Sequence, residues 1–436
     1  MFESKIEDRT AVVGILGLGY VGLPLASAFV DAGFPVLGFD TDPAKVEAIA
    51  RGESYLRHLG VDFVARMNAT GRFHATDDFA RLGEPDAVLI CVPTPLGKHQ
   101  EPDLSYVEGS TRQVAATLRR GQLVVLESTT YPGTTRDLMG PILEATGLKA
   151  GIDFLLAFSP EREDPGRQGV TTSSIPKLVG GTCARSGRLA RDLYAAAIRS
   201  VHLVSSAEVA EAAKVLENTF RAINIALVNE LKVVLDAMGI DVWEVIEAAA
   251  TKPFGFMKFT PGPGLGGHCI PIDPFYLTWI ARRHGRTTRF IELAGEINTE
   301  MPRFVVQKTM LALNQQGKAL KGARILVLGL SYKPDIDDVR ESPAIAIIEQ
   351  LEALGAVVDY SDPHVPRGHK MREHDIADWV SVPLTKQELA TRDAVIVATD
   401  HKAFDWDLVA KHARLVVDSR NALASRMAGD PRYFKA

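Results

Sequence analysis

Short apolar runs alternate with helical patterns through the first part of the chain. The runs lie at residues 12–16, 35–39, 87–92, 123–128 and 154–159. Between most of them, apolar positions recur with the spacing of amphipathic helices. Buried strands that alternate with helices form a mostly parallel sheet whose two faces are both covered. The pattern therefore predicts an α/β domain over residues 1–204.

The middle of the chain has a different pattern. Residues 205–240 read as one long helix, with apolar positions every three or four residues and a stop at Gly239. Further helices are predicted at 242–251, 275–284 and 289–315. A helical block over residues 205–315, placed between two α/β regions, is typical of a connecting or dimerising unit. We therefore expect a homodimer or a higher homo-oligomer.

The α/β pattern returns after residue 316. Buried strands are predicted at 323–330, 356–362, 394–400 and 414–419. The first and last regions read as two copies of one α/β theme, and no low-complexity segment interrupts them. The expected fold class is thus α/β: two Rossmann-like parallel-sheet domains, at 1–204 and 316–436, joined by a long central helix and a helical middle domain at 205–315.

Composition and charge exclude several classes of protein. With 436 residues the chain exceeds one ordinary hydrophobic core, and 46% hydrophobic with 24% charged residues excludes a disordered chain. A formal net charge of −5 argues against a nucleic-acid partner. No apolar run approaches the ~18–20 residues of a membrane span, and the acidic start MFESKIEDRT lacks a signal-peptide core. Three cysteines are too few for a disulfide framework, so we expect free thiols and a cytoplasmic protein.

A glycine motif follows the first predicted strand. Gly17, Gly19 and Gly22 satisfy G-x-G-x-x-G between a strand and a helix, the arrangement that brings a dinucleotide pyrophosphate to a helix N-terminus. Asp40 ends the next strand, where a carboxylate can accept the ribose hydroxyls and repels a 2′-phosphate, and Lys45 lies nearby. The motif predicts NAD as cofactor. The other residues of the loop are expected at the same site: Leu18, Tyr20 and Val21.

Polar residues also follow the later strands of this domain. Thr94, Ser128 and Thr129 lie directly after predicted strands, where ligands of open α/β sheets bind. They are candidates to bond a cofactor or a water, or else to form turns and helix caps. Glu161 follows another strand and is either a base toward water or a solvated loop acid.

On the long predicted helix, Lys214 and Asn218 are four residues apart and share one face. An ammonium beside an amide can stabilise a developing oxyanion; the alternative is that both face solvent. Asn224 and Asn229, farther along the helix, suggest a polar strip that crosses a core.

The segment 259–277 carries the sharpest signal. Its glycines exclude regular structure and can wrap a ligand with backbone groups: Gly262, Gly264, Gly266 and Gly267. Cys269 follows as a candidate nucleophile and Asp273 lies four residues later. His268 and Cys269 have no CxxC or HxxxH partners, so we expect no metal site.

The last region carries cations at strand ends. Lys333 and Arg340 lie in the turn 329–342, which has only Gly329 of the dinucleotide motif, and Arg420 follows a later strand. Lys333 and Arg420 together can hold a diphosphate by charge-assisted bonds, or else they are surface cations.

These motifs resemble the UDP-glucose and GDP-mannose dehydrogenase superfamily over nearly the whole chain. The matching elements are GLGYVGLPLA, STTYPGTT, SPERxDPG, KxxxNxxxAxxxxxxNE, PGxGxGGHCIPxD and SYKPDxxDxRES. Within it the chain is most similar to bacterial UDP-N-acetylglucosamine 6-dehydrogenases. Ile272 stands where UDP-glucose dehydrogenases usually have Lys, and Arg162 stands where they commonly have an apolar residue. Both differences put UDP-glucose in doubt as the substrate.

The resemblance implies a four-electron oxidation of a UDP-sugar C6 alcohol with two NAD⁺, for surface polysaccharide synthesis. It implies that Cys269 is the thiol of thiohemiacetal and thioester intermediates, with Lys214 and Asn218 as oxyanion donors. It further implies roles for Asp273, which orders the lysine and a water, and for Glu161 and Thr129, which activate water. Tyr332, Lys333 and Arg420 would hold the UDP, Arg340 would contact the cofactor, and the loop 262–267 would enclose the sugar; Arg162 is also expected in the substrate site.

Alternative substrates are UDP-N-acetylmannosamine and UDP-glucose. A different alternative is a two-electron dehydrogenase of the 3-hydroxyacid type, which also uses a Rossmann-like cofactor domain. It needs no thiol, so Cys269 separates the two chemistries.

Overall fold

The computed structural model describes residues 1–436 except 1, 57–58, 98–99, 163–171, 268 and 372–373. The chain forms two compact units. The first comprises Met1–Glu217 with Phe275–Thr287, and the second Asn218–Pro274 with Thr288–Ala436. Among the described residues, no helix combines the length and the low polarity that a bilayer crossing requires.

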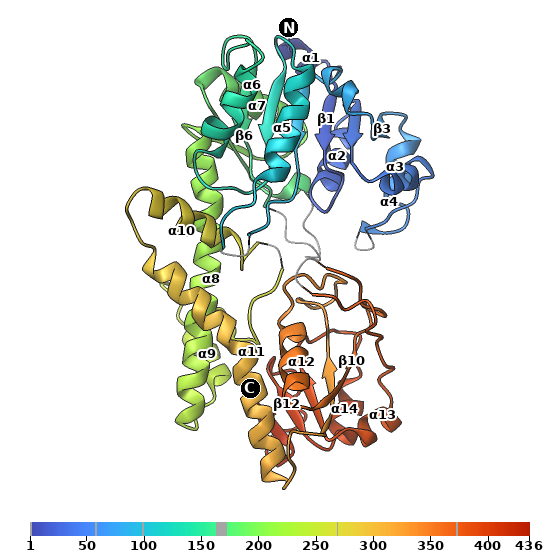
Figure 1. Ribbon diagram of the computed structural model, residues 1–436, viewed down its shortest axis with the longest axis vertical. Helices are drawn as coiled ribbons and strands as arrows, with labels where there is room; N and C mark the ends of the chain where they lie inside the picture. Colours follow the sequence, from blue (N-terminus) through green and yellow to red (C-terminus); the bar gives the residue numbers. More distant parts are fainter. Residues whose placement is uncertain (1, 57–58, 98–99, 163–171, 268, 372–373) are drawn as a thin grey trace. The chain divides into compact units, whose positions relative to one another are not determined.

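The first unit is built on one sheet, in which Figure 1 labels β1, β3 and β6. The strand order is β3-β2-β1-β4-β5-β6-β7-β8. Its strands are β1 (Val13–Leu16), β2 (Val36–Phe39), β3 (Phe73–Thr76), β4 (Ala87–Ile90), β5 (Leu123–Leu126), β6 (Leu155–Phe158), β7 (Lys177–Gly181) and β8 (Val201–Leu203). All neighbouring strands are parallel except β6 and β7. The order β3 to β6 is that of a dinucleotide-binding sheet, whose ligand crevice lies where the order reverses, between β1 and β4.

Helices cover both faces of this sheet. They are α1 (Phe2–Glu7), α2 (Gly22–Asp31), α3 (Pro43–Ala50), α4 (Phe63–Ala69), α5 (Ser105–Thr117), α6 (Gly140–Glu144) and α7 (Ala184–Ala195), with short turns η2 (Phe79–Gly83), η3 (Thr135–Met139) and η4 (Thr172–Ser174). Side chains of α2 and α7 fill the core on one face, and side chains of α5 and α6 fill it on the other. Both faces of the strands are therefore apolar, as the sequence predicts.

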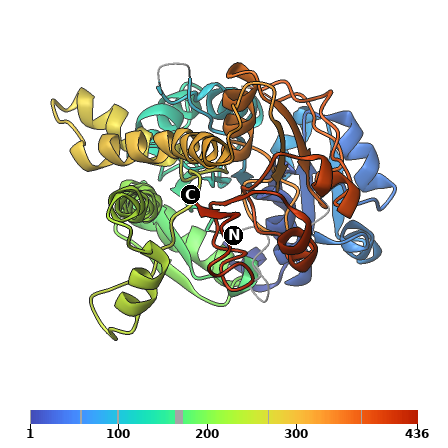
Figure 2. The ribbon, with the colours of Figure 1, turned by 90° about the horizontal axis from the view of Figure 1, so that it is seen from below.

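The predicted helices of the middle region are present. They are α8 (Ala207–Ala237), α9 (Val242–Ala250), α10 (Asp273–Arg283) and α11 (Arg289–Gln315). Figure 2 looks nearly along α8 and shows α9 beside it. Val228 of α8 packs there against Val242 and Ile246 of α9.

The second unit carries a parallel sheet in the order β10-β9-β11-β12-β13. Its strands are β9 (Arg324–Leu328), β10 (Val357–Ser361), β11 (Ala394–Val397), β12 (Val416–Asp418) and β13 (Tyr433–Lys435). Helices α11 and α12 (Pro343–Ala353) pack on one face, and α13 (Lys386–Thr391) and α14 (Trp406–His412) on the other. The predicted fold class, two parallel-sheet α/β regions with helices between them, is confirmed.

Each unit contains the same turn after its first sheet strand. Gly17 and Gly329 both have positive φ, at +96° and +85°, and each donates its N–H to the end of the neighbouring strand. The residue after each glycine donates its N–H to an aspartate, Leu18 to Asp40 and Leu330 to Asp362. The repeat that the sequence suggests is therefore present in the backbone itself.

Candidate active site

The turn after β1 has the geometry of a phosphate-binding loop. A Cβ on Gly22 would lie 1.8 Å from the Gly17 carbonyl oxygen, so only glycine fits there. A Cβ on Gly19, in contrast, would meet no described atom within 4 Å apart from its chain neighbours, which leaves the backbone open to a ligand. Helix α2 begins at Gly22, so its free N–H groups and positive dipole end face the turn. These residues fit the pyrophosphate of NAD.

Asp40 is hydrogen-bonded to this loop. Its Oδ2 accepts the Leu18 N–H at 2.9 Å and lies 3.1 Å from Lys45 Nζ, and its Oδ1 accepts the Asp42 N–H at 3.0 Å. The Tyr55 hydroxyl donates to the Leu18 carbonyl and so also bonds the loop. The carboxylate is buried and is paired with Lys45, and its discrimination against a cofactor 2′-phosphate stays a prediction.

The polar residues after β4 and β5 lie at the predicted crevice. The buried Ser128 hydroxyl donates to the Val92 carbonyl at 2.7 Å and so ties two strand ends together, which is the turn-forming alternative. The Thr94 carbonyl accepts the Tyr276 hydroxyl. Thr129 is half-buried beside them. Ligand contacts of these hydroxyls stay predictions.

Glu161 follows β6 and is held at both oxygens. Oε1 accepts the Arg162 N–H at 2.6 Å, and Oε2 accepts from Lys177 Nζ at 3.2 Å. Its side chain is only 13% exposed, so the alternative of a solvated loop acid is wrong. The Arg162 guanidinium pairs with Glu217 at 2.6 Å rather than with Glu161. The rest of the SPERxDPG motif lies outside the described residues.

Lys214 and Asn218 are both buried on α8, at 7% and 6% exposure. The solvent-facing alternative is therefore wrong. The Asn218 amide donates to Asp273 Oδ2 at 2.5 Å, and Asp273 is the first residue of α10. Helix α10 begins two residues earlier than the sequence predicts because the Asp273 N–H bonds the Cys269 carbonyl at 2.8 Å. That bond draws the segment after Cys269 into the first turn of the helix.

The glycine-rich segment before Cys269 is irregular, as predicted, and is anchored from α8. The Gly262 N–H donates to Asn229 Oδ1 at 3.0 Å, and the Asn229 amide donates to Asn298 Oδ1 at 2.9 Å. Asn229 thus belongs to the predicted polar strip. Asn224 does not, because its amide bonds the Phe220 carbonyl of its own helix.

The same segment packs on the predicted UDP residues. A Cβ on Gly262 would lie 2.6 Å from Arg420 Nη1, and one on Gly266 would lie 2.4 Å from Tyr332 Cβ. The Gly267 N–H donates to the Arg340 carbonyl at 2.9 Å. Gly264 has φ +136° and packs against Pro343. The glycines are therefore required by close approach, and the Cys269 side chain that follows them is exposed.

The cations of the last region divide in their roles. Arg420 is half-buried, and its Nε donates to the Ala398 carbonyl at 2.8 Å, which fixes the guanidinium at the end of β11. Burial lowers the Arg420 pKa, while Asp400 and Asp418 oppose that shift. The Arg340 side chain pairs with Asp338 at 2.6 Å, and its contact with a cofactor stays a prediction. Lys333 lies half-buried in the turn after β9.

Arg420→Ala tests this assignment. Charge-assisted hydrogen bonds contribute about 1.5–3 kcal/mol, so the KM for a UDP-sugar is expected to rise roughly 10- to 150-fold while kcat changes little. Steady-state kinetics of NADH formation measure both constants. Arg426→Ala is the matched control, since Arg426 pairs with Asp407 on the surface. An equal KM in the two variants would contradict the role of Arg420.

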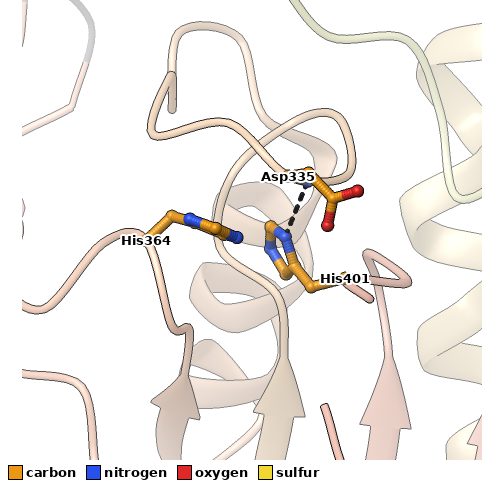
Figure 3. A group of neighbouring side chains, drawn as sticks. All are labelled: Asp335, His364 and His401. Atoms are coloured by element: carbon orange, nitrogen blue, oxygen red, sulfur yellow. Dashed lines mark hydrogen bonds between the residues drawn. The ribbon is translucent and has the colours of Figure 1, made fainter. Parts of the chain in front are cut away.

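A cluster of possible metal ligands lies at the same edge of the second sheet (Figure 3). Among the described residues, Asp335, His364 and His401 place one ligand atom each within 4.8 Å of one another. However, His401 Nδ1 accepts the Asp335 N–H at 3.0 Å, and Nε2 lies 3.0 Å from Asp362 Oδ2. Both ring nitrogens are engaged, so the group fits a hydrogen-bond network that holds the turn 331–335 better than a metal site.

Several residues near the site do not stand out in the sequence. Lys177, Glu127 and Tyr194 form a buried cluster next to Glu161. Glu127 precedes Ser128 in the same strand-end motif, so an acid there is a usable signal. Lys177 begins a strand with two glycines, which has no pattern of its own, and its partners are distant in sequence.

Comparisons with known proteins agree with this geometry. Three models of the UDP-glucose/GDP-mannose dehydrogenase family match the chain: the NAD binding domain at residues 11–198, the central domain at 208–300 and the UDP binding domain at 326–425.

Two relatives and one solved structure extend the comparison. A UDP-N-acetyl-D-mannosamine dehydrogenase of Pyrococcus horikoshii is 35% identical over 96% of this chain and 97% of that protein. A UDP-N-acetyl-D-glucosamine 6-dehydrogenase of Pseudomonas aeruginosa is 36% identical over 90% of this chain and 91% of that protein. The solved structure of a UDP-D-ManNAc dehydrogenase from Pyrococcus horikoshii has a TM-score of 0.88 at 34% identity, and the match covers 97% of this chain and 98% of that one.

Proposed function

The chain belongs to the UDP-glucose/GDP-mannose dehydrogenase family, and from this premise we propose that it oxidises the C6 alcohol of UDP-N-acetylglucosamine to a carboxylate. It is an oxidoreductase with an NAD-binding domain. The proposed reaction removes four electrons and passes through covalent intermediates on Cys269.

One observation carries the proposal. In the second unit, the segment that leads to Cys269 packs its glycines on Arg420 and Tyr332, the residues expected at the UDP. The same segment continues into Asp273, which receives the Asn218 amide. An exposed thiol is thus linked by a short, tightly packed segment both to the nucleotide residues and to an oxyanion donor. A two-electron dehydrogenase needs no such thiol.

The residues supply distinct parts of the chemistry. The Gly17–Gly22 loop would hold the pyrophosphate of NAD⁺, which would supply the hydride acceptor for both oxidations. The Cys269 thiolate adds to the aldehyde carbon and keeps the aldehyde from escaping. Lys214 and Asn218 donate to the oxygen that becomes negative, and Asp273 fixes the Asn218 amide. Glu161, with Thr129, activates the water that releases the acid.

The sugar is proposed from two positions. Ile272 is buried and stands at the position, next to the final aspartate, where UDP-glucose dehydrogenases usually have a lysine. Arg162 is held by Glu217 and by the Pro176 carbonyl at 2.7 Å, so it presents a fixed polar group beside Glu161. Both support an N-acetylated sugar over glucose. UDP-N-acetylmannosamine is the second candidate, because one of the relatives is named for it.

A panel of UDP-hexoses tests the function. Two NADH per acid product are expected, with the highest kcat/KM for UDP-N-acetylglucosamine. A higher kcat/KM for UDP-N-acetylmannosamine or UDP-glucose would contradict the proposed sugar but leave the proposed four-electron reaction in place. One NADH per product would exclude the four-electron reaction.

We propose that the protein is a homodimer formed through α8. Phe220, Leu227, Leu231 and Val234 lie on one face of this helix and are exposed in the single chain. Leu227→Glu is expected to shift the molar mass in light scattering from dimer toward monomer. Glu230→Gln on the same helix is the control, and an unchanged dimer in both variants would place the interface elsewhere.

Localisation and domain division are proposals as well. We propose a cytoplasmic enzyme of surface polysaccharide synthesis, since all three cysteines are free thiols. We also propose that residues 205–315 act as a separate dimerising domain between 1–204 and 316–436.

A further inference from the structure

A buried lysine lies directly behind Glu161. Lys177, the first residue of β7, is 4% exposed, and its ammonium donates to Glu127 Oε2 at 2.6 Å, Glu161 Oε2 at 3.2 Å and the Pro160 carbonyl at 3.4 Å. An ammonium has three N–H groups, and all three are used. Glu127 is in turn bonded by the Tyr194 hydroxyl from α7. Lys177 therefore has a fixed position between two carboxylates.

The charges of this cluster favour a protonated lysine. Burial alone lowers the Lys177 pKa, but Glu127 and Glu161 outweigh burial and raise it. Burial raises the Glu127 pKa to about 7, with Lys177 opposing that shift and Glu161 adding to it. Among the described residues, Cys91, after β4, and Tyr194 also face the cluster, and burial raises the pKa of both. The thiol and the phenol stay neutral, so Lys177 supplies the positive charge among these groups.

The geometry of Glu161 depends on this cation. Its second oxygen is bonded by a backbone N–H, from Arg162, which cannot change its charge. The Arg162 guanidinium does not help, because it is bonded to Glu217 and to the Pro176 carbonyl. Among the hydrogen bonds of the described residues, Lys177 supplies a cation that bonds the Glu161 carboxylate directly. Without it, two carboxylates would face each other in a buried site, and one would take up a proton.

We propose that Lys177 is a positioning residue for the hydrolysis of the thioester: anchored on Glu127, it orients Glu161 and keeps it as a carboxylate that can accept a proton. This inference rests on the proposed function. In the step concerned, an O–H bond of water breaks and its proton moves to Glu161. The water oxygen bonds the thioester carbonyl carbon, the C–S bond breaks, and sulfur leaves with the electron pair as the Cys269 thiolate. No oxidation or reduction takes place.

The decisive variant is Lys177→Met combined with Glu127→Gln. The pair removes both charges together, so no unpaired Glu127 carboxylate remains to unfold the domain. In stopped-flow experiments with UDP-N-acetylglucosamine and NAD⁺, a burst of two NADH per active site is expected at a rate within about threefold of wild type. The steady-state rate is expected to fall about 10²-fold, the lower end of a general-base contribution. An acid quench should trap the acyl-enzyme, visible as added mass on Cys269.

Two further variants separate positioning from structure. Lys177→Arg keeps the charge and should recover part of the steady-state rate. Lys5→Met removes another lysine of the same unit, which pairs with Asp86 at 2.8 Å before β4, and should leave all phases unchanged. The acid limb of the kcat profile should move to higher pH in the double variant and stay in place in Lys5→Met.

The outcomes are distinguishable. If wild type forms two NADH but the double variant loses burst and steady state equally, or loses neither, the role of Lys177 is contradicted. An unmoved acid limb contradicts it as well. If wild type forms one NADH per product, the proposed function fails before Lys177 is tested.

Discussion

Cys269→Ser is expected to lower the steady-state formation of acid by at least about 10³-fold. A serine hydroxyl is a far weaker nucleophile than a thiolate, so the aldehyde is not captured as a covalent adduct that can be oxidised again. An adduct that does form is an oxygen ester, which hydrolyses more slowly than a thioester. NADH formation should therefore stall at one or two per active site. Mass spectrometry and NADH absorbance together measure both the stall and any covalent product.

The control for this variant is Cys183→Ser. Cys183 caps α7, its sulfur accepting the Ser186 N–H at 3.4 Å, and serine is at least as good a cap. Activity within about twofold of wild type is expected. Full turnover by Cys269→Ser with two NADH per acid would show that the thiol is not the covalent group and would remove the proposed mechanism.

Lys214→Met is expected to lower kcat about 10²–10³-fold with a much smaller change in KM. The oxyanion exists only in the transition states and the intermediates, so loss of its donor weakens those states and not the bound substrate. Lys214 is buried on α8, where methionine fills a similar volume without the charge. Steady-state kinetics at several UDP-sugar concentrations separate the two constants.

Lys232→Met is the matched control, because Lys232 is a second buried lysine on α8. Burial lowers its pKa to about 8, with Asp236 opposing, so removing it deletes no strongly held charge. We expect kcat within about twofold of wild type. If both variants lost the same activity, the effect of Lys214 would be one of helix stability, and a thermal unfolding scan would show the matching loss.

Most of the fold could be predicted because buried parallel strands are continuous apolar runs. VVGIL and ARILVLGL are continuous apolar runs next to amphipathic helical patterns, and this combination predicts buried parallel strands. β3, β7, β8 and β13 escaped prediction for the opposite reason. FHAT, VHL and YFK are short and partly polar, and KLVGG joins a lysine to two glycines, so only pairing with a neighbouring strand makes them strands.

The candidate site also contains residues that the sequence could predict and residues that it could not. The glycines near Cys269 could be found, because a backbone that must approach Arg420 or Tyr332 so closely excludes every side chain. Lys177 could not, because a lone lysine usually reads as a surface residue. Its role depends on the hydrogen bond to Glu127, which lies 50 positions away in sequence. The two residues meet only because the strand order of the sheet brings their strands close together.

The repeated turn has a consequence for how the two halves divide their work. Asp40 in the first half bonds two backbone N–H groups and one lysine. Its counterpart Asp362 accepts from the backbone of Leu330, Ser331, His364 and Val365 and faces the His401 ring. A carboxylate with that many donors has no lone pair to offer a vicinal diol. The aspartate of the second copy of the turn therefore could not accept ribose hydroxyls in the way predicted for Asp40.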